Sequence, residues 1–178
     1  MIDEKAILLG VLAAHRDARK WDGADFERIK FVSNTKVGDV GQEFVEALCT
    51  ALKLDVTFPA NKKGLRAKQS PWDVCIEGVE FELKTASEDV SNAFQFNHIR
   101  YHRTYHGLIC LGIAPSDIYF NIWPKADVTT GKAGSLVSME KGANASYKLT
   151  KKSNGLFPIN LFHSKITEFT TKYKAESP

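Results

Sequence analysis

Hydrophobic residues recur every three to four positions in four parts of the chain, which is the spacing of one face of an amphipathic helix. The clearest case is Thr35–Leu54, whose apolar stripe runs from Val37 to Leu52. The same spacing predicts three further helices, the middle one short: Ile2–Lys20, Asp25–Phe31 and Leu161–Lys174.

A different pattern, the alternation of apolar and polar residues, marks Pro71–Ala86. It predicts two short strands joined by a tight turn at Glu77-Gly78, with Trp72 on the same apolar face as Val74 and Ile76. Leu108–Ile113 is a continuous apolar run, typical of a central strand covered on both faces. Shorter strand patterns complete the set: Asp55–Phe58, Ile118–Trp123, Leu136–Met139 and Tyr147–Leu149.

The segment Phe94–His106 mixes aromatic residues with amides, histidines and arginines. We predict a helix there, with one face packed and the other wet and basic. In chain order the elements predict one α/β domain over residues 1–178, built on a mixed central sheet of about five strands flanked by helices.

Composition narrows the class of protein without assigning a function. A hydrophobic content of 43% and a charged content of 25% are ordinary for a soluble globular protein. No apolar run is long enough to span a membrane, and acidic residues precede the apolar run near the N-terminus, so we expect no membrane association and no signal peptide. The three cysteines lie in apolar segments, which favours reduced core residues and a cytoplasmic location. The net charge of +3 permits nucleic-acid binding but does not argue for it.

Charged residues on the polar side of Pro71–Ala86 are the strongest candidates for chemistry. If its two strands pair as a hairpin, Asp73, Glu82 and Lys84 meet on one face. Two carboxylates and a lysine on a sheet face are costly unless they bind something, and a divalent cation is the natural candidate. Mg²⁺ is usually held by one or two carboxylates with water and substrate phosphate. The lysine could orient or activate an attacking water, or neutralise charge on the phosphate. The alternative is an exposed hairpin face with an ordinary ion pair.

These residues resemble a known motif. Pro71-(Trp72)-Asp73, followed after eight residues by Glu82-Leu83-Lys84, is similar to the PD-(D/E)XK motif of restriction-endonuclease-like nucleases. The inserted Trp72 departs from the strict pattern, in which proline adjoins aspartate. The resemblance covers about half of the chain, residues 36–123, and implies a restriction-endonuclease-like core with N-terminal helical and C-terminal additions. It also implies that Asp73, Glu82 and the Leu83 carbonyl hold Mg²⁺ and that Lys84 serves the attacking water.

The same resemblance implies helper residues beside the motif. Glu43 lies on the preceding helix and is a candidate accessory acid, and Gln95 is a candidate to touch the catalytic site. Candidates for DNA contact are Asn97, Arg100 and Arg103. The basic loop Asn61–Ser70 adds residues suited to gripping phosphates: Lys62, Lys63, Arg66 and Lys68. For each of these residues, an ordinary solvated surface position is the alternative.

The sequence therefore predicts a Mg²⁺-dependent DNA endonuclease of the type II restriction kind. The alternatives are a repair or junction-resolving nuclease of the same fold and a non-catalytic DNA-binding module, although the intact Asp/Glu/Lys set argues against the module. One such site cuts one strand, so we expect a homodimer acting on double-stranded DNA. The helices Ile2–Lys20 and Leu161–Lys174 are candidate dimer contacts, unless their apolar faces simply cover the sheet.

Overall fold

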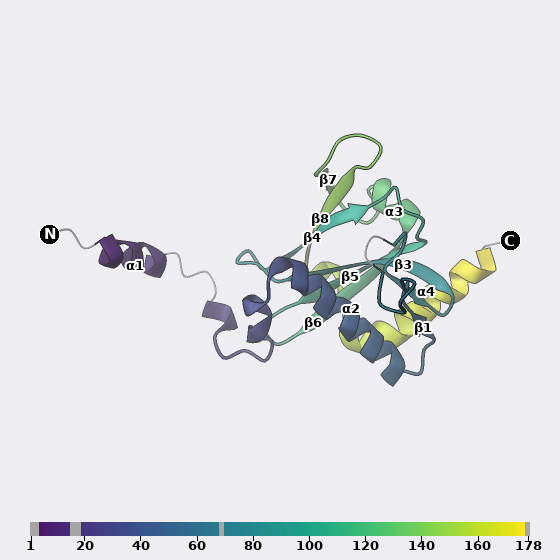
Figure 1. Cartoon of the computed structure of the whole chain (residues 1–178), viewed down its shortest axis with the longest axis horizontal. Coiled ribbons are helices and arrows are strands. Elements are labelled where there is room, and N and C mark those ends of the chain that lie inside the picture. Colours follow the sequence, from purple (N-terminus) through teal and green to yellow (C-terminus); the bar gives the residue numbers. More distant parts are fainter. Residues whose placement is uncertain (1–3, 15–18, 68–69, 177–178) are drawn as a thin grey trace.

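A six-stranded mixed sheet forms the centre of the computed structural model, which describes residues 4–14, 19–67 and 70–176 (Figure 1). The strand order is β1-β2-β3-β5-β6-β9, with β3 and β5 parallel and all other neighbours antiparallel. The mixed sheet is as predicted, with six strands instead of about five. Its strands are β1 (Val56–Thr57), β2 (Val74–Ile76), β3 (Val79–Ser87), β5 (Gly107–Ile113), β6 (Ile118–Pro124) and β9 (Phe157–Pro158).

A second, three-stranded antiparallel sheet has the order β4-β8-β7. Its strands are β4 (Ala93–Arg100), β7 (Leu136–Ser138) and β8 (Ser146–Lys152). The prediction of a helix over Phe94–His106 is therefore wrong. Buried Phe94 and Phe96 alternate with exposed Gln95 and Asn97, a period of two in an aromatic-rich segment, and this pattern favours a strand.

A β-bulge in β4 explains why that alternation was hard to see. The register against β8 shifts between Phe96 and Ile99, and His98 has a φ of 56°. The extra residue moves Ile99 to the buried face, three positions after Phe96, and this spacing imitates a helix. As a result Arg100 falls on the same side of β4 as Gln95 and Asn97.

Helices cover one face of the six-stranded sheet. They are α2 (Asn34–Ala51) and α4 (Phe162–Glu176), close to the predicted bounds, and they share a core with alternate residues of β3 and β5. The three-stranded sheet and α3 (Lys125–Thr129) cover the opposite face. Figure 1 shows this arrangement, with the β7–β8 hairpin standing away from α2 and α4. Because both faces are covered, every residue of β5 is buried, as the apolar run predicts.

The remaining short elements lie outside these layers. The 3-10 helices η1 (Arg19–Trp21) and η2 (Glu27–Phe31) pack near the end of β5, and η3 (Ser153–Gly155) and η4 (Ile159–Leu161) flank β9. Helix α1 (Glu4–Ala14) lies apart from the sheets (Figure 1). None of the helices in the described part of the chain is both long and apolar enough to cross a membrane.

The hairpin of β2 and β3 forms as predicted, with one correction. Glu77 and Gly78 both have positive φ, 51° and 78°, which is the backbone of a type I′ turn. Val74 and Ile76 point into the helix-covered core, but Trp72 packs against the other core cluster. Strand β2 begins only at Val74, so the alternation does not extend back to Trp72.

Helix α2 lies unusually close to β3 at Gly41. A Cβ at this position would lie 2.8 Å from Thr85 Cβ, which is closer than real Cβ contacts. Gly38 lies on the same helix, and a Cβ added there would have no neighbour within 4 Å outside the adjacent backbone of the helix. Glycine at position 41 therefore sets the distance between the helix and the strand that carries Glu82 and Lys84.

We expect Gly41→Ala to lower the free energy of unfolding by about 1–3 kcal/mol, because the added methyl group forces α2 and β3 apart. Gly38→Ala is the matched control, and it should raise stability by up to about 1 kcal/mol through helix propensity. Urea unfolding monitored by circular dichroism measures both. Equal stabilisation by the two substitutions would show that α2 does not approach β3 this closely.

Candidate functional site

Two carboxylates lie side by side where the chain enters β2. The backbone N–H of Asp73 donates to the carbonyl of Phe81 at 2.8 Å, so the hairpin ladder holds Asp73 next to Glu82 of β3. Asp73 Oδ2 accepts a hydrogen bond from the N–H of Leu83 at 3.0 Å. Glu82 is fully buried. The hairpin backbone thus fixes the Asp73 carboxylate directly and places Glu82 beside it.

Lys84 completes the trio that the alternation predicts. Its Nζ lies 2.6 Å from Glu82 Oε1 and 3.5 Å from Asp73 Oδ2. The lysine side chain is itself largely buried, with 14% exposed. The structure therefore brings Asp73, Glu82 and Lys84 together on one face, while their chemical roles stay predictions.

A second cation, Arg100, bridges the two carboxylates from β4. Its Nε lies 3.1 Å from Glu82 Oε1, and a terminal guanidinium nitrogen lies 3.2 Å from Asp73 Oδ1. Burial acts to lower the pKa of Arg100, but the charges and hydrogen bonds of Glu82 and Asp73 outweigh it and raise the pKa above its usual value. Arg100 was predicted to touch DNA, whereas here it neutralises the carboxylates together with Lys84.

These groups open onto a cleft of about 580 Å³ between α2, β3 and β4. Of the predicted site residues, it includes Asp73, Leu83, Lys84, Gln95, Asn97 and Arg100. Glu82 is buried and does not line the cleft, and its carboxylate contacts two residues that do, Lys84 and Arg100. The cleft is thus lined by residues from distant parts of the sequence, and most of the predicted trio and its neighbours share it.

Glu43 does not line this cleft. It is exposed on α2, whereas Asp39 and Gln42 from the same helix form part of the wall. Each residue turns the helix by about 100°, so Glu43 projects about 40° to one side of Asp39, whereas Gln42 projects about 60° to the other side. Glu43 therefore does not line the cleft, although it lies only one helical turn from Asp39.

Asp89, which the sequence analysis did not single out, organises the opposite wall. Burial acts to raise the pKa of Asp89, but hydrogen bonds from Ser91, Gln95 and Ala93 outweigh it and lower the pKa to about 2. Asp89 Oδ2 accepts from Gln95 Nε2 at 3.0 Å, so Gln95 is held at the cleft. The Asp-x-Ser spacing of a turn is the signal that points to Asp89.

Some side chains of the basic loop Asn61–Ser70 are exposed, and others contact neighbouring parts of the protein. Lys62 and Lys63 are exposed. Arg66 instead donates to Gln42 at 2.9 Å, pairs with Glu46 at 2.8 Å, and stacks on the ring of Phe58. Lys68 lies outside the described residues. Outside this loop, Arg103 donates to the Ser70 carbonyl.

The donor set suits a hard divalent cation. Asp73 and Glu82 both contact the guanidinium of Arg100, so one positive charge reaches both carboxylates. Among residues 4–14, 19–67 and 70–176 no group of three or more His, Cys, Asp or Glu side chains has metal-binding geometry. Mg²⁺ commonly takes only one or two carboxylates, with water and phosphate as its other ligands, so the pair Asp73 and Glu82 fits this ion.

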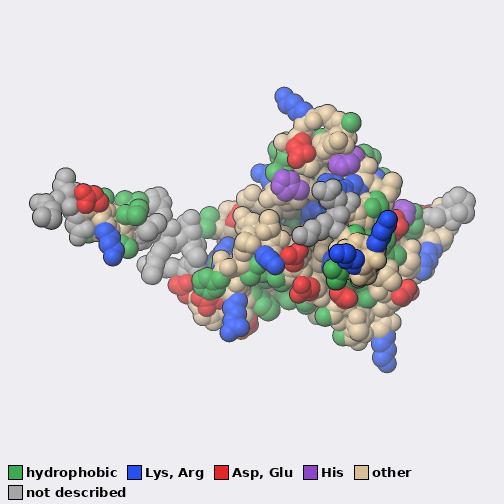
Figure 2. Space-filling model, viewed as in Figure 1, with side chains coloured by type: hydrophobic (Ala, Val, Ile, Leu, Met, Phe, Trp, Pro, Cys, Tyr) green, Lys and Arg blue, Asp and Glu red, His purple; other side chains and the backbone are tan. Residues whose placement is uncertain are grey.

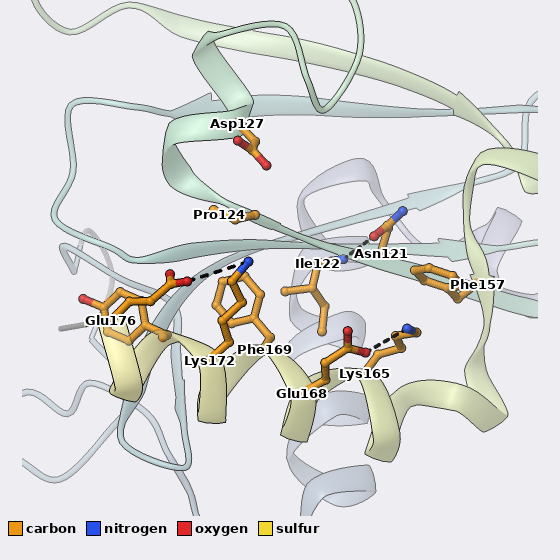
Figure 3. Close-up of a pocket in the computed structure, with 11 residues that line it drawn as sticks. Asn121, Ile122, Pro124, Asp127, Phe157, Lys165, Glu168, Phe169, Lys172 and Glu176 are labelled. Carbon is orange, nitrogen blue, oxygen red and sulfur yellow. Dashed lines mark hydrogen bonds and ion pairs between the residues drawn. The ribbon is translucent and has the colours of Figure 1, made fainter.

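A second cavity, of about 430 Å³, lies between α4 and β6 (Figure 3). Its charged side chains are paired: on α4, Lys165 Nζ lies 2.8 Å from Glu168 Oε2 and Lys172 pairs with Glu176 at 3.8 Å, and Asp127 of α3 pairs with Lys132 at 3.6 Å. The cavity in Figure 3 therefore offers matched ion pairs, whereas the cleft beside β3 gathers charges from separate elements.

Comparison with known proteins gives a likeness in structure but none in sequence. Neither a family model nor a curated protein sequence matches the chain. Among solved structures, the bacterial homing endonuclease I-Ssp6803I is similar over 79% of this chain and 99% of its own, with 9% sequence identity and a TM-score of 0.46. A likeness at this level assigns no function, so the residues of the cleft are the evidence for function.

We expect a double-mutant cycle of Arg100→Ala and Glu82→Gln to give a coupling free energy of about 1–3 kcal/mol. The reason is that loss of the guanidinium leaves a buried carboxylate with only one of its two positively charged partners. The matched control is the more exposed pair of Arg66 and Glu46, where Arg66→Ala and Glu46→Gln should couple by less than about 1 kcal/mol. Urea unfolding at low salt without divalent metal measures both cycles. Equal coupling in the two would contradict a special role for Arg100.

Proposed function

We propose that the chain is a Mg²⁺-dependent DNA endonuclease of the type II restriction kind. The observation that carries the proposal is the convergence of the Asp73 and Glu82 carboxylates and the Lys84 ammonium group at one cleft. Phosphodiester hydrolysis needs positive charge at the phosphate and an oriented water, and this set of residues can supply both. The resemblance to the PD-(D/E)XK motif supports the same reaction.

Asp73 and Glu82 are the proposed Mg²⁺ ligands, with the main-chain carbonyl of Leu83 as the third. The ion, when bound, supplies charge neutralisation of the phosphate and activation of water. The hydrogen bond from the Leu83 N–H to Asp73 Oδ2 holds the Glu82–Leu83 peptide, which directly precedes this carbonyl, against the Asp73 carboxylate. The protein thus prepares the site through its own hairpin before any substrate arrives.

Lys84 and Arg100 have different proposed roles. Lys84 is held by the carboxylates at the cleft, where its ammonium group can orient the attacking water or neutralise the phosphate. Arg100 occupies the carboxylates with its guanidinium, so a divalent cation competes with it for the same oxygen atoms. Once released, Arg100 can pair with a DNA phosphate, to which guanidinium geometry is well matched.

We expect Asp73→Asn, Glu82→Gln and Lys84→Ala each to abolish Mg²⁺-dependent cleavage of plasmid DNA while the protein stays folded. Calorimetry should show weaker Mg²⁺ binding for the two carboxylate variants, little change for Lys84→Ala, and tighter binding for Arg100→Ala because its competing charge is gone. Glu80→Gln, on the same face of β3 but outside the cleft, is the matched control. Cleavage at the wild-type rate by any of the three variants would remove that residue from the site.

Lys62 and Lys63 are the proposed phosphate contacts of the basic loop. Because each lost phosphate contact reduces the slope of log affinity against log salt by about 0.9, Lys62→Ala with Lys63→Ala should flatten it by about two units. Arg66→Ala should instead lower stability, since Arg66 is engaged with Gln42, Glu46 and Phe58. Fluorescence anisotropy over a salt series tests this. An unchanged slope in the double lysine variant would mean that the loop is only solvated.

The proposed active form is a homodimer, because a double-strand cut needs two sites. Helix α4 buries Phe162 and Ile166 in the core, so it covers the sheet. Helix α1 instead carries apolar side chains at its surface, visible in green in Figure 2. They are Ile7, Leu8, Leu9 and Val11, each at least half exposed. This apolar surface supports a contact with a second copy through α1.

We expect sedimentation at micromolar concentration to give a dimer, with and without DNA, and Ile7→Lys with Val11→Lys to give a monomer that only nicks plasmid. Phe31→Ser is the matched control, since Phe31 is 79% exposed but lies outside α1. A wild-type monomer that makes concerted double-strand breaks would contradict the dimer.

A further inference from the structure

The three-stranded sheet has one apolar face and one polar face. Phe94, Phe96 and Leu149 point into the second core cluster and are fully buried. Side chains alternate across a strand, so the residues between them point to the opposite side. We call this side the outer face. Its members are Gln95, Asn97, Val137, Lys148, Thr150 and Lys152, of which all but the half-buried Lys148 are exposed.

The register places hydrogen-bonding groups and positive charges beside one another on the outer face. Gln95 of β4 lies directly opposite Thr150 of β8. Along β8, Lys148 and Lys152 flank Thr150 at two-residue spacing, while the intervening Lys151 points inward to the ring of Trp123, 5.5 Å away. None of the six residues of the outer face is acidic, and one carboxylate borders it, that of Asp89, which accepts a hydrogen bond from Gln95 Nε2 at 3.0 Å. The face therefore combines neutral groups that can donate and accept hydrogen bonds with an excess of positive charge.

The outer face is continuous with the candidate catalytic site. Gln95 and Asn97 line the same cleft as Asp73 and Lys84. The bulge at His98 keeps Arg100 on this side of β4, where it reaches the carboxylates. A single elongated ligand with regularly spaced negative charges can therefore contact the outer face and the carboxylate site at the same time.

We propose that the outer face reads the base sequence of double-stranded DNA, which is an inference that rests on the nuclease function proposed above. Gln95, Asn97 and Thr150 contact base edges, because amides pair with adenine through two hydrogen bonds and threonine suits several bases. Lys148 and Lys152 contact phosphates and set position without reading sequence. A two-stranded β-ribbon fits the width of the major groove, so the paired strands β4 and β8, which carry all five of these residues, can enter it.

The test distinguishes residues that recognise bases from residues that contact only phosphates. The full-length protein, with EDTA present to prevent cleavage, selects bound duplexes from a random double-stranded pool, and the bound duplexes are sequenced. We expect Gln95→Ala, Asn97→Ala and Thr150→Val each to relax or change the preferred base at one position, by about ten- to one-hundredfold in relative affinity. Lys148→Ala and Lys152→Ala should keep the preferred sequence and flatten the salt slope by about 0.9 each. Asn160→Ala and Thr167→Val, exposed residues away from this sheet, are the matched controls.

Each outcome decides between the two proposals. If the wild-type protein cleaves plasmid but the three outer-face variants keep its sequence preference, the outer face does not read DNA while the nuclease function stands. If the wild-type protein cleaves plasmid but binds DNA without any sequence preference, the outer face again does not read DNA and the nuclease function stands. If the wild-type protein neither binds nor cleaves DNA, both proposals fail together. Altered preference in Asn160→Ala or Thr167→Val would also overturn the assignment to the outer face.

Discussion

Burial of the Glu82 carboxylate is the constraint on which this architecture depends. A buried charge is tolerated only when paired and hydrogen-bonded, and Glu82 has two cations, Lys84 from its own strand and Arg100 from β4. Arg100 reaches Glu82 only because the bulge in β4 turns it to this side. Electrostatics thus ties the three-stranded sheet to the six-stranded one, in addition to the shared apolar core.

The same arrangement explains how a structural charge cluster can also be a functional one. Replacing buried ion pairs by apolar residues is often neutral or stabilising, so such a cluster is weak evidence for stability as its purpose. Here two carboxylates are neutralised by two cations at the floor of an open cleft, and one of the cations is a bridging guanidinium. A site of this kind can exchange its internal cation for an external one with little change in net charge, which favours binding of a divalent ion.

The hairpin and its charged trio were predictable from sequence because they rest on local rules. Period-two alternation and a glycine-containing turn specify β2 and β3, and the side-chain positions of Glu82 and Lys84 follow from the strand geometry. The hydrogen bond from the Asp73 N–H to the Phe81 carbonyl extends this pairing to Asp73, just before β2. The strand nature of β4 was missed because the bulge gives Phe96 and Ile99 a helical spacing. The pairing of Arg100 with Glu82, and the position of Glu43 outside the cleft, depend on how elements pack, which no local pattern contains.

The central claim is that Asp73 and Glu82 form one cation site on the β2–β3 hairpin. The most direct measurement is a titration of isotopically labelled protein with Mn²⁺, followed by paramagnetic broadening of backbone amide signals. We expect the first signals to broaden to be those of Asp73, Leu83 and Lys84, and we expect the effect to be lost in Glu82→Gln. Broadening that begins elsewhere, for example around Asp127 in the second cavity, or that persists in Glu82→Gln, would contradict the claim.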